Sequence, residues 1–101
     1  METIDVGFNL LKSLQPLSSL KNIVTLLCNN NQLVTLDVEL TNFKRLVTLQ
    51  LKSNPLLYVS IQISECILLQ ELGLSETFIV TLPATMSKLK KLKKLDLGEN
   101  I

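Results

Sequence analysis

A 23-residue motif built on leucine recurs from residue 23 to the end of this chain. The copies begin at Ile23, Leu46, Leu69 and Leu92, and they read IVTLLCNNNQL, LVTLQLKSNPL, LQELGLSETFI and LKKLDLGENI. A fixed period of roughly 20 to 50 residues marks chains in which each unit buries its apolar face against the next one. The spacing therefore predicts a small solenoid.

The L-x-L part of each copy alternates between inward and outward side chains, as a β-strand does. Stacked copies of such a strand predict a parallel sheet on the concave wall of the solenoid, with irregular segments and helical turns on the convex side. The expected fold class is therefore an α/β solenoid, a horseshoe segment with a short parallel sheet. The strand residues expected to point into the core are Leu26, Cys28, Leu49, Leu51, Leu72, Leu74, Leu95 and Leu97.

The second half of each copy keeps the same register. Its apolar residues are expected to line the inner side of the convex wall, in short helical turns or extended segments. They are Leu33, Leu36, Val38, Leu40 and Phe43 in the first copy, Leu56, Val59, Ile61, Ile63 and Cys66 in the second, and Ile79, Leu82, Ala84, Met86 and Leu89 in the third.

One polar position recurs after each strand and holds Asn31, Asn54, Thr77 and Asn100. The chain turns away from the sheet here, which leaves backbone groups without partners in the strand ladder. A buried side-chain amide can satisfy those groups across neighbouring copies, so we interpret the four residues as a structural Asn ladder. We expect the third turn to be weaker, because the Thr77 hydroxyl donates one hydrogen bond where an amide donates two.

Residues 1–22 depart from the 23-residue register, because extending it backwards places polar Thr3 and Asp5 inward. Apolar Ile4, Val6 and Phe8 alternate there instead, so we expect a cap that covers the first leucine layer. The apolar residues that follow at near-helical spacing are Leu10, Leu11, Leu14 and Leu17. The expected division is 1–22 for the N-terminal cap-like segment and 23–45, 46–68, 69–91 and the incomplete 92–101 for the repeats.

The segment IVTLPATMSKLKKLKKLDLGEN carries the run L-P-x-x-[hydrophobic]-x-x-L-x-x-L-x-x-L-x-L-x-x-N. Together with the other copies, it resembles the 23-residue intracellular type of leucine-rich repeat found in signalling scaffolds of the Ras-suppressor and Scribble kind. The resemblance covers residues 23–101 and implies a protein-binding role. Such proteins have more repeats and a C-terminal cap, so this chain is expected to be a fragment, to have its last strand covered by another subunit, or to have a frayed fourth copy, and a fragment is favoured.

The charge and composition of the chain argue against several classes of function. Ten basic and nine acidic residues give a net charge of +1, which offers no overall attraction to nucleic acid or membranes. The sequence holds no histidine, no phosphate-binding loop and no nucleophile motif, so we expect neither an enzyme nor a cofactor or metal site.

The two cysteines, Cys28 and Cys66, fall at inward positions and are expected to be buried thiols that act as small hydrophobes. The N-terminus lacks the basic and apolar regions of a signal peptide, and no apolar run is long enough for a membrane span. Together these features favour a cytoplasmic location.

Partners of leucine-rich repeats generally meet the outward residues of the strands, and the leading prediction is a protein–protein interaction module or scaffold that binds an unidentified protein there. The predicted contacts are Thr25, Leu27, Asn29, Thr48, Gln50, Lys52, Glu71, Gly73, Ser75, Lys94 and Asp96. Leu27 is either a tolerated exposed leucine or a contact anchor. Phe78 is either a contact on the rim or part of the loop packing.

Two alternatives stay open. The incomplete last copy leaves leucines uncovered, so the chain is alternatively a capping or self-associating segment that uses its C-terminal end. Five lysines within seven positions form either a solvated convex ridge or a site for an acidic partner, nucleic acid or anionic lipid. Nucleic acid is disfavoured, because no arginine or stacking aromatic residue lies nearby. The ridge comprises Lys88, Lys90, Lys91, Lys93 and Lys94.

Overall fold

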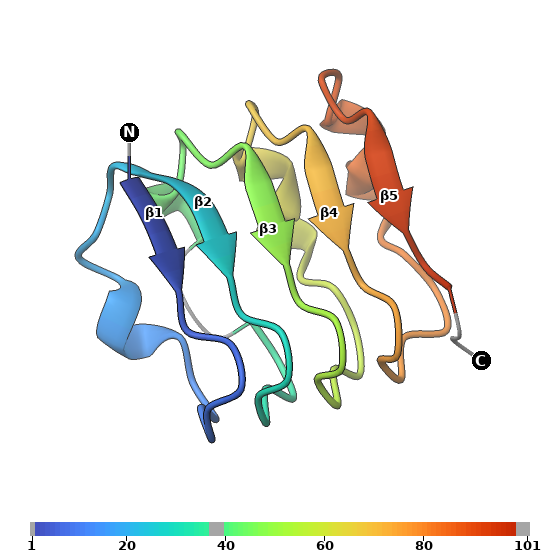
Figure 1. The fold of residues 1–101 in the computed structure, drawn as a ribbon. Coiled ribbons are helices and arrows are strands. Elements are labelled where there is room, and N and C mark those ends of the chain that lie inside the picture. The colour runs from blue at the N-terminus through green and yellow to red at the C-terminus, as the bar shows by residue number, and fades with distance from the viewer. Residues whose placement is uncertain (1, 37–39, 99–101) are drawn as a thin grey trace.

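The computed structural model describes residues 2–36 and 40–98. Five strands form one parallel sheet in chain order: β1 (Glu2–Asp5), β2 (Ile23–Leu27), β3 (Thr48–Gln50), β4 (Glu71–Gly73) and β5 (Lys94–Asp96). A short 3₁₀ turn follows each of the first four strands: η1 (Gln15–Leu17), η2 (Leu40–Asn42), η3 (Ile61–Glu65) and η4 (Ala84–Lys88). The strands form one wall and the 3₁₀ turns lie behind it, which confirms the predicted solenoid (Figure 1).

Neighbouring strands pair at the spacing of the repeat. Leu26 lies opposite Leu49, which lies opposite Leu72, and Leu72 lies opposite Leu95. The first three of these leucines are at most 1% exposed. Leu95 and Leu97, which were predicted to be core residues, are 36% and 37% exposed, because no described element covers the far side of β5.

Residues 1–22 contribute a strand that the 23-residue register does not detect. In the pairing of β1 with β2, Ile4 lies opposite Leu26, which is one position short of the repeat length. Thr3 and Asp5 are exposed, whereas Ile4, together with Val6, packs against the buried core. The segment therefore lies over the first leucine layer as one more strand and turn of the same solenoid.

The convex side follows the predicted pattern except at one position of the repeat. Ile61 is 68% exposed and Ala84 is exposed, although both were predicted to point inward. Each is the first residue of a 3₁₀ turn, and side chains three residues apart share a face in that helix. The inward face of η3 is taken by Ile63 and the following Cys66, so Ile61 faces solvent. Val38, at the equivalent position of the first copy, lies outside the described residues.

One residue after each of the first four strands adopts a left-handed backbone conformation. These residues are Phe8, Asn30, Ser53 and Glu76, with φ between 55° and 61°. The backbone N–H of each donates to a carbonyl of the next layer; that of Ser53, for example, donates to Ser75 at 3.0 Å. A non-glycine residue with a bulky side chain is strained in this conformation, so the hydrogen bond and the turn impose it.

Replacement of Phe8 by asparagine should stabilise the fold by about 1 kcal/mol, because asparagine tolerates the left-handed conformation and the exposed Phe8 ring contributes little burial. Urea unfolding measures the change. Phe8→Ala is the matched control, since it removes the ring but keeps a residue that is disfavoured at this φ. Equal stability of the two variants would show that backbone strain at Phe8 is negligible.

Leu72→Ala should lower the free energy of unfolding by roughly 2–5 kcal/mol, because Leu72 is 1% exposed in the middle of the leucine stack. Leu95→Ala removes the same atoms from the same row at a position that is 36% exposed, and it should cost clearly less. Chemical denaturation of both variants tests the layer arrangement. An equal loss at the two positions contradicts it.

Candidate functional site

The outward residues of adjacent strands form two rows across the concave face. Each member of a row lies opposite its neighbours in the sheet register. The first row is Thr25, Thr48, Glu71 and Lys94, and the second is Leu27, Gln50, Gly73 and Asp96. The fold thus brings eight of the predicted contact residues together on one continuous face.

Two predicted contacts on this face are not open to solvent. Gly73 is buried, and a Cβ atom at Gly73 would collide with the side-chain amide of Gln50 and lie 2.7 Å from its Cδ. The Gln50 side chain therefore rests on the Gly73 backbone. Ser75 is 7% exposed. At β4 the face consequently consists of the half-buried Glu71 and the side-chain amide of Gln50. This amide fits there because Gly73 has no side chain.

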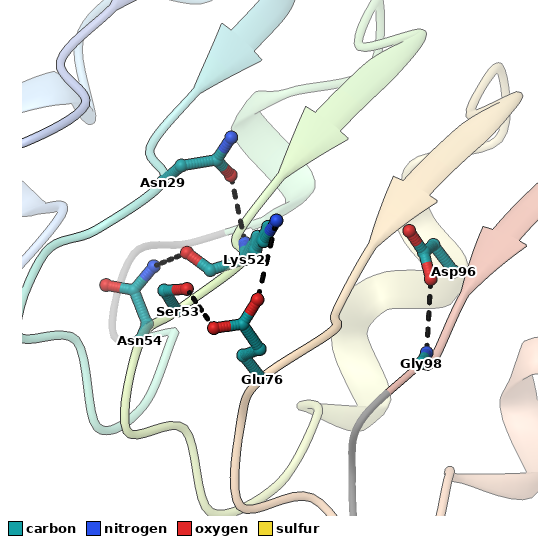
Figure 2. Close-up of polar contacts among 7 residues, drawn as sticks. All are labelled: Asn29, Lys52, Ser53, Asn54, Glu76, Asp96 and Gly98. Carbon is teal, nitrogen blue, oxygen red and sulfur yellow. Dashed lines mark hydrogen bonds and ion pairs between the residues drawn. The ribbon is translucent and has the colours of Figure 1, made fainter.

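The rim below β3 holds an ion pair that joins consecutive repeats. Lys52 Nζ lies 3.4 Å from Glu76 Oε2, and the Ser53 hydroxyl donates to Glu76 Oε1 at 3.1 Å (Figure 2). Both charged side chains are about half exposed, so the pair contributes little to stability. Its effect is to hold Lys52 toward the rim. Glu76 was not among the predicted contacts; its place one full repeat after Ser53 is the sequence signal for it.

Two other predicted contacts are fastened to backbone amides. Asn29 Oδ1 accepts a hydrogen bond from Lys52 N at 2.9 Å, and Asp96 Oδ1 accepts one from Gly98 N at 3.1 Å (Figure 2). Leu27 is half-buried, whereas Phe78 is 56% exposed on the loop after β4. The lower part of the concave face thus presents side chains of fixed orientation.

The asparagines behind the face connect the layers. Asn54 Nδ2 donates to Cys28 O at 3.0 Å in the preceding repeat and to Leu51 O at 2.9 Å in its own, while Asn54 Oδ1 accepts from Leu33 N at 3.2 Å. Asn31 makes the equivalent bonds, to Val6 O, Cys28 O and Leu11 N. Asn100 lies outside the described residues.

One member of this row, Asn9, lies outside the 23-residue register and was not predicted. The Asn9 amide donates to Val6 O at 2.8 Å and to Gly7 O at 3.2 Å, as the later asparagines donate within their own turns. Asn9 precedes Asn31 by one position less than the repeat length, the same shortened spacing that hid β1. Thr77 Oγ1 donates to Leu74 O at 2.9 Å, and a hydroxyl has no second hydrogen for the layer before it.

Thr77→Asn should therefore stabilise the fold by about 0.5–1.5 kcal/mol, through one added cross-repeat hydrogen bond from the new amide. Asn54→Thr is the reciprocal change, and it should destabilise by about 0.5–1.5 kcal/mol because it removes one cross-repeat bond to Cys28 O, which keeps its bond from Asn31 Nδ2. Guanidinium unfolding of the two variants gives both values. A loss of stability in Thr77→Asn would contradict the ladder interpretation.

The cysteines are free thiols in the core. Burial raises the pKa of Cys28 to about 12, with a smaller contribution from the Asp5 carboxylate. Burial also raises the pKa of Cys66 to about 12, where Glu65 adds to the effect and Lys44 opposes it. Both thiols stay protonated at neutral pH, and Cys66 Sγ donates to Leu40 O at 3.7 Å, so neither is poised as a nucleophile.

Elsewhere on the molecule, the described residues offer no group of three side chains suited to hold a metal ion. Among the same residues, no helix is long and apolar enough to cross a membrane. The five lysines of the predicted ridge are all exposed, and the intervening Leu89 is buried.

Comparison with known proteins agrees with the geometry. No protein-family model matches the sequence, and no curated protein matches it. Among solved structures, a leucine-rich repeat protein from Leptospira interrogans superposes with a TM-score of 0.91 at 32% sequence identity. The match covers 99% of this chain and 26% of the Leptospira protein, so this chain spans about a quarter of that protein's length.

A leucine-rich repeat fold is a non-enzymatic repeat architecture that suits protein interaction in general. The strand register, the row of buried asparagines and the match to a solved repeat protein all agree on this architecture. The chain therefore has the leucine-rich repeat fold, a solenoid with a parallel concave sheet.

Proposed function

We propose that this chain is a protein-interaction module, with the concave sheet as its binding face. The observation that carries the proposal is the row Thr25, Thr48, Glu71 and Lys94, whose members lie side by side on consecutive strands. The first three are half-buried, and Lys94 is exposed. The row therefore begins with two threonine hydroxyls and ends with the negative Glu71 beside the positive Lys94. Such a row suits a partner surface with complementary polar and charged groups.

The chemistry of the face supports a scaffold role. Leu27 and Gln50 follow each other in the second row and offer one aliphatic contact beside one amide. The rim adds Phe78, and aromatic side chains are enriched at protein interfaces. Since Asn29 is tied to the backbone of the next repeat, this part of the face loses little conformational entropy on binding.

A reducing intracellular location belongs to the same proposal. Two free, buried thiols are compatible with a compartment in which cysteines stay reduced. An intracellular signalling scaffold is the setting in which such a binding face would operate.

Affinity capture from a lysate of the source cells tests the binding face. The variant Thr48→Arg places a large charged side chain at the centre of the concave row, and Gln62→Arg places the same side chain on the exposed convex turn η3. A partner should be retained by the original chain and by Gln62→Arg and lost at least ten-fold with Thr48→Arg, after circular dichroism confirms that both variants are folded. Equal retention by the two variants would place the binding site elsewhere.

A second candidate role is structural, and the exposure of Leu95 and Leu97 favours it. The open edge of β5 and these two leucines match the surface that each earlier strand buries against the next layer. A further repeat layer or a second copy of the chain would cover them. Sedimentation at several protein concentrations tests for cover by a second copy, since self-association increases with the concentration of the chain.

A further inference from the structure

The turns that lead into the strands gather positive charge on one edge of the solenoid. These turns are residues 18–22, 43–47, 66–70 and 89–93, which connect the 3₁₀ turns to β2, β3, β4 and β5 along the upper edge in Figure 1. They hold six of the ten basic residues and none of the acidic ones. We call this set the basic edge: Lys21, Lys44, Arg45, Lys90, Lys91 and Lys93.

The six cations of the basic edge are open to solvent. All six side chains are exposed. In the described part of the chain none of them lies within 4.0 Å of a carboxylate, and the ion pair found there joins Lys52 and Glu76 instead. Two further lysines flank the last turn, Lys88 at the end of η4 and Lys94 at the start of β5. Their combined field therefore acts outward. Among the acidic residues of the described part, Glu65 and Glu71 flank the third turn, and Glu2 begins β1 opposite Ile23, beside the first turn.

The repeat sets the spacing of these charges. Lys21, Lys44, Ile67 and Lys90 occupy the same position of consecutive repeats. Backbone bonds fasten each turn to the next, with Val47 N donating to Val24 O and Gln70 N donating to Val47 O, both at 2.8 Å. Adjacent turns are consequently about 4.8 Å apart, as adjacent strands are, and the cations form a fixed row.

An apolar side chain interrupts the row at its third turn. Ile67 occupies the position held by lysine in the other three turns and is 58% exposed, and the following Leu68 is half-buried. The aromatic residue of these turns, Phe43, is fully buried, so no ring is available for stacking on nucleic-acid bases. A surface that combines anionic phosphates with an apolar layer beneath them can accept both the lysines and the isoleucine.

We propose that the basic edge docks on an anionic membrane surface. The lysines and Arg45 face lipid phosphates, while Ile67 enters the interface between them. In this orientation the two concave rows stay accessible to a protein partner. Membrane binding is therefore independent of the proposed protein-interaction function. Lysine suits the role because its ammonium acts as a compact point charge toward phosphate and needs no paired geometry.

Co-sedimentation with lipid vesicles tests the proposal on the full chain. Binding is expected to phosphatidylcholine vesicles that contain phosphatidylserine, to weaken as sodium chloride increases, and to be much weaker with phosphatidylcholine alone. The double variant Lys90→Ala, Lys91→Ala should lower the partition coefficient about 25-fold, since each lysine near the surface contributes about five-fold. Lys12→Glu makes the same net change of two charges on an exposed loop away from the basic edge, and it should change binding much less.

Ile67→Ser separates the apolar contribution from the charges and should lower vesicle binding about ten-fold. Ile61→Ser removes an isoleucine of at least comparable exposure from the convex side and is expected to have little effect. Failure of the original chain to bind anionic vesicles would overturn the proposal, as would equal losses in the edge and control variants. Binding to an oligonucleotide or an acidic peptide with the same dependence on Lys90 and Lys91, without vesicle binding, would assign the edge to that partner instead.

Discussion

The cross-repeat amide hydrogen bond is the constraint on which the rest of this solenoid depends. Asn54 donates to a carbonyl of its own turn and to Cys28 O of the layer before it, and it accepts from Leu33 N. The chain can therefore leave the sheet at a buried point without unpaired backbone groups. Once the turn is held in this way, the strands stack at one register, and every position of the repeat becomes a row across the molecule.

Most of the fold follows from a period that can be read in the sequence, since Leu26, Leu49 and Leu72 occupy one face at the constant spacing of the repeat. Two features of the fold could not be predicted from this period: a strand that is out of register, and a residue that is in register but faces solvent. β1 is displaced by one residue, so Ile4 and Asn9 fall out of a strict count. Ile61 is in register yet exposed, because its inward or outward direction depends on where a 3₁₀ turn begins, and the apolar pattern does not encode that point.

The candidate binding face shows the same division. Strand alternation is enough to place Thr25, Thr48 and Glu71 in one row, because side chains of a strand alternate between two faces. The contacts among those side chains depend on rotamers and turn geometry. The Gln50 amide lies over Gly73, and the left-handed turns at Ser53 and Glu76 bring the Glu76 carboxylate to Lys52.

Net charge is a poor guide to the surface of a repeat protein. Ten cations and nine anions nearly cancel along the chain, yet a solenoid collects residues by their place in the repeat and not by their distance along the sequence. Lys21 and Lys44 thus lie on adjacent turns, about 4.8 Å apart, although a full repeat separates them in the chain. Their fields add locally because the Debye length at physiological salt is about 8 Å, longer than the spacing between neighbouring turns. A chain that is almost neutral overall can therefore present a strongly positive edge, and charge should be counted along the rows of the repeat.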